Sequence, residues 1–223
     1  MSEILPGIHQ VEGVDPSPDF STHVYLLKDG GNRWTLVDTG LPDYAGAVLK
    51  YLEAQHIAPT DVHRILITHL HRDHTGNLKK LAHATKARTF AHWVEAAFIA
   101  QRPAYDGPGT PPAEPFEVSE QVKDGDTIDS FGGLEVLHTP GHTPGHVAYF
   151  QRERKVLFSG DLFFGEPGGK LVLSVPDYTH HTGEAQISAR RVSRLPVDSV
   201  MSYHGGPVLK GGGAAIQHVV TTF

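Results

Sequence analysis

The segment HRILITHLHRDHTGNLKKLA (residues 63–82) passes from an apolar strand directly into a dense polar cluster and then into a helix. Its apolar start is typical of a buried strand, and GNLKKLA resumes helical spacing. Between them, THLHRDH (68–74) holds three histidines and an aspartate. The chain must therefore fold so that a strand ends, turns and continues as a helix around groups with the chemistry of metal ligands.

The rest of the chain repeats this alternation of strands and helices. Short β-branched and aromatic runs predict strands at 22–27, 34–40, 87–92, 123–128, 134–140, 146–151, 155–161 and 198–206. Apolar periodicity predicts helices at 42–55, 93–101, 182–195 and 214–223, with Pro42 suited to a first helical turn. The mixture indicates layered α/β sheets, in one domain spanning residues 1–223. The stretch RPAYDGPGTPPAEPF (102–116) is expected to be a lid or binding loop.

Composition restricts both the ligands and the partners. The chain has no cysteine, so any metal must be held by nitrogen and oxygen. Sixteen histidines stand against nineteen Lys and Arg together, which is an unusual excess of imidazole. A net charge of −6 provides no basic field for nucleic acid or a membrane surface. With no leader-like start and no long apolar run, we expect a cytoplasmic protein that acts on a small molecule; the oligomeric state stays open.

The spacing of the histidine cluster predicts two metal ions rather than one. His69 and His71 are two apart, so they point to the same side of an extended segment, and Asp73 and His74 follow a turn. One ion cannot take all four from so short a segment, but two adjacent ions can share them. Such a centre needs about six to seven protein ligands. Further candidates follow apolar strands beside glycine, in TPGHTPGH (139–146), FSGD (158–161) and SYHGG (202–206).

This order of residues resembles the signature of the metallo-β-lactamase superfamily. The pattern His-x-His-x-Asp-His is followed by a histidine in Gly-His-Thr, an aspartate and a late histidine, and the likeness includes LVDTG (36–40). The resemblance implies a four-layer αββα sandwich with the metals at one edge. It implies that the first ion takes His69, His71 and His142. The second would take Asp73, His74 and His204, and Asp161 would bridge the two.

The ligand set also indicates the chemistry. Two adjacent divalent ions would lower the pKa of a bridging water, so that hydroxide could attack an acyl or phosphoryl group at neutral pH. Asp73 could then accept the proton of the nucleophile and help to protonate the leaving group. Zinc suits imidazole and carboxylate ligands best, although iron, manganese or cobalt could occupy the same set. We therefore expect a zinc-dependent hydrolase of a small ester, thioester or lactone.

Departures from known subgroups narrow the substrate. The commonest zinc β-lactamases have cysteine where Asp161 stands, so β-lactam hydrolysis is expected only as a weak side activity. Glyoxalase II enzymes carry a C-terminal extension that binds glutathione, whereas nineteen residues follow His204 here, which argues against glutathione thioesters. Acyl-homoserine lactonases usually place a tyrosine where this chain has Phe164, and Tyr178 could replace it.

Two other classes of function stay open. One is a mononuclear iron persulfide dioxygenase, and the other is a metal-bearing domain without catalysis. Among the supporting residues, Asp38 either holds a metal-bound imidazole or caps a turn. His146 is expected to be structural, and His180 and His181 to be exposed or to face the site.

Overall fold

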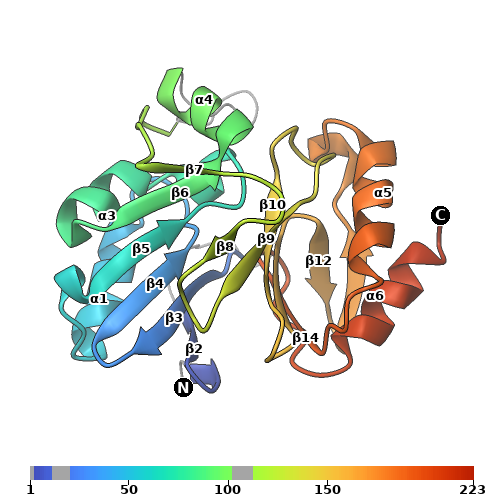
Figure 1. Cartoon of the computed structure of the whole chain (residues 1–223), viewed down its shortest axis with the longest axis horizontal. Helices are drawn as coiled ribbons and strands as arrows, with labels where there is room; N and C mark the ends of the chain where they lie inside the picture. Colours follow the sequence, from blue (N-terminus) through green and yellow to red (C-terminus); the bar gives the residue numbers. More distant parts are fainter. Residues whose placement is uncertain (1–2, 12–20, 102–112) are drawn as a thin grey trace. The chain divides into compact units, whose positions relative to one another are not determined.

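The computed structural model describes residues 3–11, 21–101 and 113–223, and the chain divides into two compact units (Figure 1). The first unit comprises residues 1–18 and 22–122, and the second comprises residues 19–21 and 123–223. Each unit contains its own β-sheet and helices, as the alternation of strands and helices predicted. That residues 1–223 form a single domain stays a prediction.

Within the described residues, the first unit holds a mixed seven-stranded sheet whose strands lie in sequence order. The first four strands pair antiparallel and the last four pair parallel, with β4 common to both sets. The strands are β1 (Glu3–Leu5), β2 (Ile8–Val11), β3 (Val24–Gly30), β4 (Arg33–Val37), β5 (Val62–Leu66), β6 (Arg88–His92) and β7 (Glu120–Val122).

Helices connect the parallel strands of this unit, because parallel neighbours need a crossover connection. They are α1 (Ala45–Ala54), η1 (Pro59–Asp61), α2 (Arg72–Thr75), α3 (Leu78–Thr85) and α4 (Trp93–Gln101). Strands β4, β5 and β6 all end at the same edge of the sheet, since they run in the same direction. The residues after β4 and β5, including the histidine cluster, are therefore brought to one edge.

The second unit is built around a five-stranded sheet with the order β14-β11-β10-β9-β8. Among the described strands of that sheet, β11 and β14 pair parallel and the other neighbours pair antiparallel. The strands of the unit are β8 (Thr127–Ile128), β9 (Leu134–His138), β10 (Val147–Gln151), β11 (Val156–Gly160), β12 (Phe163–Glu166), β13 (Lys170–Leu173) and β14 (Ser199–Ser202). Strands β12 and β13 form a separate hairpin.

The helices of the second unit are η2 (Pro176–Tyr178), α5 (Thr182–Val192) and α6 (Gly212–Val220). Figure 1 shows α5 and α6 next to each other in this unit, and the two helices are in contact. Their apolar sides complete a buried core with strand residues such as Phe150, Leu157 and Val200. This burial against the sheet supplies most of the stability of such short helices.

Several sequence-based expectations differ from the structure in detail. The helix predicted from residue 42 begins at Ala45, because Asp43 takes a left-handed conformation (φ 72°) that no helix interior permits. The hairpin of β12 and β13 was not predicted, because these four-residue strands, FFGE and KLVL, have no alternation of apolar and polar residues. Of the expected loop at 102–116, residues 102–112 lie outside the described residues.

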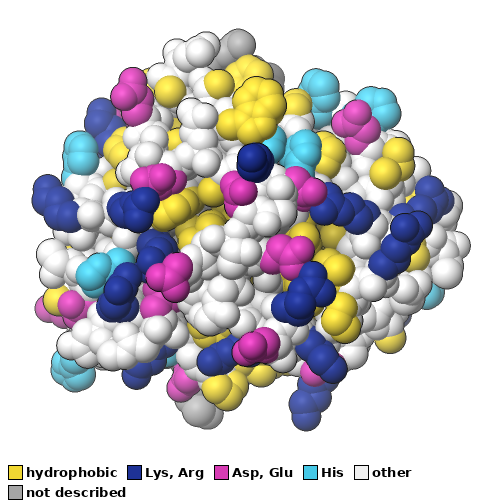
Figure 2. Space-filling view, in the orientation of Figure 1, with side chains coloured by type: hydrophobic (Ala, Val, Ile, Leu, Met, Phe, Trp, Pro, Cys, Tyr) yellow, Lys and Arg dark blue, Asp and Glu magenta, His cyan; other side chains and the backbone are white. Residues whose placement is uncertain are grey.

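Figure 2 shows Lys and Arg side chains interspersed with Asp and Glu over the face in view. Charged side chains also form ion pairs, such as Arg88–Glu120 and Arg191–Asp124. Among residues 3–11, 21–101 and 113–223, no helix combines the length and the apolar character that crossing a membrane would require.

Candidate functional site

His69 and His71 lie in the segment that follows β5 in the first unit. The strand continues its pairing as far as the Ile67 N–H, which donates to the Phe90 carbonyl at 2.8 Å. His69 is fully buried, and its Nε2 lies 3.0 Å from Nδ1 of His71. Two ligand nitrogens bound to one ion at about 2.0–2.1 Å in tetrahedral geometry are about 3.3 Å apart. The two imidazoles therefore have nearly the spacing that a shared ion requires.

The short helix α2 carries Asp73 and His74. It is started by the His71 carbonyl, which accepts the His74 N–H at 3.0 Å. His74 is fully buried, and its Nε2 lies 3.5 Å from an Asp73 carboxylate oxygen. The Asp73 side chain retains 19% of its exposure, so it borders solvent while His74 does not. This pair can also present a nitrogen and an oxygen to one ion.

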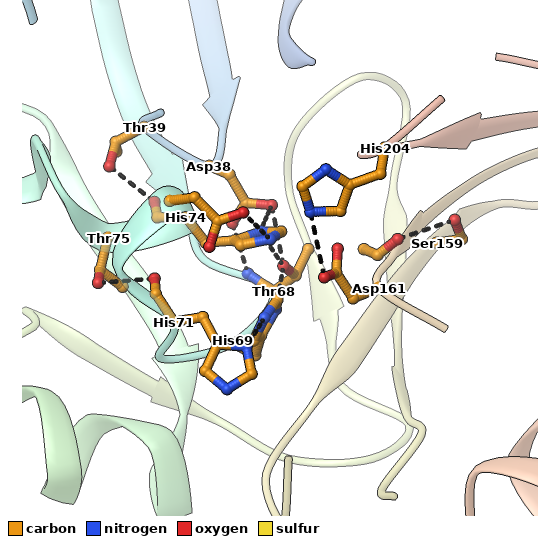
Figure 3. Close-up of polar contacts among 12 residues, drawn as sticks. Asp38, Thr39, Thr68, His69, His71, His74, Thr75, Ser159, Asp161 and His204 are labelled. Carbon is orange, nitrogen blue, oxygen red and sulfur yellow. Dashed lines mark hydrogen bonds and ion pairs between the residues drawn. The ribbon is translucent and has the colours of Figure 1, made fainter. Parts of the chain in front are cut away.

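Asp38 lies directly after β4 and bonds to the histidine cluster (Figure 3). Its Oδ1 accepts the Thr68 N–H at 2.8 Å, and its Oδ2 accepts the Thr68 hydroxyl at 2.9 Å and His74 Nδ1 at 2.9 Å. Burial raises the pKa of the Asp38 carboxyl, while attraction and hydrogen bonding from His74 and Thr68 oppose that rise. A proton held on Nδ1 leaves Nε2 of His74 as the atom that can bind metal. Of its two expected roles, Asp38 thus has the one that holds an imidazole.

Sequence reasoning missed Glu95 as a residue of this cluster. Its side chain is fully buried, and Oε2 accepts the N–H of Leu70 at 2.7 Å. Leu70 lies between His69 and His71, so the contact is made to the backbone of the ligand segment. A signal was present, since Glu95 is the one charged residue in the apolar helix WVEAAFIAQ.

In the second unit, three predicted ligands lie at one edge of the sheet. His142 is in the turn between β9 and β10, Asp161 follows β11, and His204 follows β14. Asp161 Oδ2 lies 3.4 Å from Nε2 of His142 and 3.4 Å from Nε2 of His204. All three residues are at most 7% exposed, and Figure 3 shows His204 directed at Asp161. One carboxylate oxygen is thus within ligand-to-ligand distance of two imidazoles, as a bridging ligand would be.

His146 holds the backbone of Asp161. The Asp161 N–H donates to His146 Nε2 at 3.0 Å, and Nδ1 of the same ring lies 2.8 Å from the Thr139 hydroxyl. Because the backbone N–H can only donate, Nε2 is an acceptor and the neutral ring carries its proton on Nδ1. His146 is fully buried, which agrees with the structural role expected for it.

The turn with His142 is held by the start of α5. The carbonyls of Gly141 and His142 accept the N–H groups of His181 at 2.8 Å and His180 at 3.0 Å. Gly141 has a φ of +132°, and a Cβ there would lie 2.1 Å from the Ala185 nitrogen. The side chains of His180 and His181 are exposed, so their backbone, not their imidazoles, supports the ligand turn.

Phe164, where the lactonases have tyrosine, packs edge-on against His204. The ring centroids are 4.9 Å apart, and Phe164 is 7% exposed. It therefore gives the His204 imidazole an apolar neighbour without a hydroxyl. Tyr178, the suggested substitute, is 54% exposed on η2.

The structure thus brings the predicted ligands together in two sets, one in each unit. The first set contains His69, His71, Asp73 and His74, and the second contains His142, Asp161 and His204. Each set alone has the spacing of metal ligands.

Comparison with known proteins agrees with the sequence signature. The family model of the metallo-beta-lactamase superfamily matches residues 17–204. The hydroxyacylglutathione hydrolase of Methylobacillus flagellatus is 34% identical over 180 residues, which are 79% of this chain and 59% of that protein. The same enzyme from Pseudomonas entomophila is 34% identical over 188 residues, 82% of this chain and 61% of that protein. The chain therefore spans about three fifths of these relatives.

A solved structure supports the fold. The metallo-beta-lactamase family protein of Thermus thermophilus matches with a TM-score of 0.78 and 26% identity, covering 98% of this chain and 80% of that one. The predicted α/β metallo-β-lactamase fold is confirmed. The matched residues include every predicted ligand from His69 to His204, and the chain belongs to the metallo-β-lactamase superfamily.

Proposed function

We propose that the protein is a binuclear, zinc-dependent hydrolase of a small thioester, with esters and lactones as related substrates. The observation that carries the proposal is the position of Asp161, whose Oδ2 lies 3.4 Å from ligand nitrogens of both His142 and His204. If Asp161 only formed a hydrogen bond to one imidazole, a second imidazole at the same distance from Oδ2 would not be needed. A carboxylate that bridges two ions would have one imidazole ligand of each ion beside it, as Asp161 has His142 and His204.

The ligand assignment follows the superfamily pattern. In the proposal, His69, His71 and His142 hold the first ion, and Asp73, His74 and His204 hold the second. Asp161 is the ligand common to both. The spacings of 3.0 Å for His69 and His71 and 3.5 Å for Asp73 and His74 support this division within the first unit. Six side chains that bind through nitrogen or oxygen, together with one bridging carboxylate, suit zinc. Iron, manganese or cobalt could also bind to this set.

Two ions held by these residues would supply hydroxide at neutral pH and would polarise the carbonyl under attack. Asp73 accepts the proton of the attacking water and delivers it to the departing sulfur or oxygen, so that water and thioester yield acid and thiol. Its partial exposure of 19% suits a group that must meet both solvent and substrate. Asp38 keeps the His74 ring in the form that binds metal through Nε2.

The relatives support a thioester as the first substrate to test. Two of them are named hydroxyacylglutathione hydrolases, so we propose the thioester of a small hydroxy acid. Because the chain spans about three fifths of their length, the thiol carried by the substrate is open, and glutathione is one candidate. Phe164 beside His204 supplies no hydroxyl for a lactone, which places lactones second.

The test combines metal analysis with a substrate panel. The purified protein is assayed for zinc, iron and manganese, and then for turnover of a hydroxyacylglutathione, the same acyl group on a smaller thiol, an acyl-homoserine lactone and a β-lactam. About two zinc per chain with thioester turnover is the expected result. One iron per chain, with oxygen consumption on a persulfide, would replace the proposal by a dioxygenase. Full metal loading without turnover of any substrate in the panel would leave a non-catalytic metal domain.

A further inference from the structure

The backbone of Leu70, which lies between His69 and His71, is hydrogen-bonded through both of its polar groups. On one side, the N–H of Leu70 donates to Glu95 Oε2 at 2.7 Å. On the other, the Leu70 carbonyl accepts the Thr75 hydroxyl at 3.0 Å, and the same hydroxyl lies 3.0 Å from the His71 carbonyl. These contacts are made to the backbone that joins the two histidines.

Burying the Glu95 carboxylate costs desolvation free energy, so its position must be explained by the contacts that it makes. Its side chain is fully buried, and a carboxylate removed from water is destabilising unless hydrogen bonds compensate it. At 2.7 Å, the bond to Leu70 has the length of a charge-assisted hydrogen bond. Glu95 also lies in the first turn of α4, where the helix dipole favours a negative charge.

The orientation of the two peptide groups that flank Leu70 governs the spacing of the ligand atoms. His69 and His71 project from the two ends of this short segment, and a rotation of the peptide moves one ring relative to the other. Metal sites tolerate ligand distances only within about 0.2 Å. The present spacing of 3.0 Å between the two ring nitrogens thus depends on how the peptide is held.

We propose that Glu95 is a positioning residue for metal binding, which acts by holding the peptide N–H of Leu70 and so presets the His69–His71 pair. The inference rests on the proposed function, because it takes these two histidines as ligands of one ion. Thr75 holds the carbonyl side of the same segment and is the partner of Glu95 in this role.

The experiment compares four substitutions in the full chain. Glu95→Ala removes the acceptor, and Glu95→Gln keeps an oxygen that can accept the Leu70 N–H. Thr75→Val removes the hydroxyl at nearly constant volume. Ile99→Ala is the matched control, because Ile99 is a buried residue of α4 (5% exposed) one turn further along the helix. Zinc affinity is measured by competition with a chromophoric chelator, and the stability of the metal-free protein is measured by urea unfolding.

Glu95→Ala is expected to weaken zinc binding by about 10- to 100-fold, the usual effect of removing a group that orients a ligand. Glu95→Gln should stay within about threefold of the wild type, with Thr75→Val between the two. Ile99→Ala should lower the stability of the metal-free protein and leave zinc affinity unchanged. With cobalt in place of zinc, the visible spectrum should change in Glu95→Ala and not in Ile99→Ala.

Two results would overturn the inference. Wild-type zinc affinity in Glu95→Ala would show that the peptide needs no such support. Equal weakening in Glu95→Ala and Ile99→Ala would reduce the effect to general destabilisation of α4. In both cases the wild type still binds zinc, whereas a wild type without zinc binding would instead refute the proposed function. If Glu95→Ala does not fold, the comparison of Thr75→Val with Ile99→Ala decides in the same way.

Discussion

Replacing Asp38 by asparagine tests how the first unit prepares His74 for metal. The carboxylate accepts three hydrogen bonds, from the Thr68 N–H, the Thr68 hydroxyl and His74 Nδ1, at 2.8–2.9 Å. Asparagine has the same shape but only one accepting oxygen. If that oxygen faces the Thr68 N–H, the amide NH₂ meets His74 Nδ1. If the amide is turned round, NH₂ meets the Thr68 N–H instead.

In either orientation, two buried hydrogen-bond donors face each other, unless, in the first, the His74 ring changes its protonation. The free-energy cost of this arrangement can be estimated. Asp38 is 1% exposed, so water cannot replace a lost partner. An unsatisfied buried donor costs about 1–3 kcal/mol, and we expect the metal-free Asp38→Asn protein to lose stability by that amount. In the first orientation, Nδ1 of His74 becomes an acceptor and the proton moves to Nε2, the atom that should bind metal. Zinc affinity is therefore expected to fall by about 10- to 100-fold.

The measurements are urea unfolding of the metal-free protein and zinc competition with a chelator. Asp29→Asn is the matched control, since Asp29 is another shielded carboxylate of the same sheet, bonded to the Thr35 hydroxyl at 2.8 Å and paired with Arg64. It should lower stability without changing zinc affinity. If Asp38→Asn loses stability but binds zinc like the wild type, the carboxylate does not set the protonation of His74.

Three further outcomes are expected. Asp73→Ala should keep the circular dichroism spectrum and reduce thioester turnover by at least ~10²-fold, because it removes a ligand and a proton acceptor; near-normal turnover would exclude that role. Gly141→Ala should lower the free energy of unfolding by at least about 1–3 kcal/mol, because its Cβ would lie 2.1 Å from the Ala185 nitrogen. An unchanged unfolding midpoint would contradict this expectation. Burial lowers the pKa of His9, so the unfolded chain takes up a proton near the ordinary value of 6.5 while the folded protein does not. Stability should therefore fall as the pH drops from about 7 to 5, and fall less in His9→Gln; equal pH dependence in both proteins would exclude His9 as a source.

The sequence allowed the strand ends of the candidate site to be predicted, because the relevant pattern is local. An apolar run followed by histidine or aspartate, with a glycine beside Asp161 and His204, marks a strand that ends in a turn. The structure places His69, Asp161 and His204 after β5, β11 and β14, as that pattern indicates. Whether these side chains bind metal stays a prediction.

The supporting contacts could be predicted only in part, since two roles were open for Asp38 and no role was expected for Glu95. Glu95 is 25 residues from Leu70, and Asp38 is 36 residues from His74. A hydrogen bond needs only one acceptor at the right place, and many residue types on any neighbouring element can supply it. Because the partners are far apart in the sequence and the acceptor can be any of several residue types, these contacts produce no regular spacing that a sequence pattern could reveal.

Asp38, Glu95 and His146 nevertheless share a feature that could guide such predictions. Each is at most 1% exposed, and each bonds to a ligand residue or to the peptide beside one. A buried polar group of this kind does not strengthen an apolar core, since an apolar residue of similar size would avoid the cost of desolvation. Its presence is better explained by what it holds in place. For this reason a charged residue alone in an apolar helix, such as Glu95 in WVEAAFIAQ, indicates a partner elsewhere in the fold before that partner can be named.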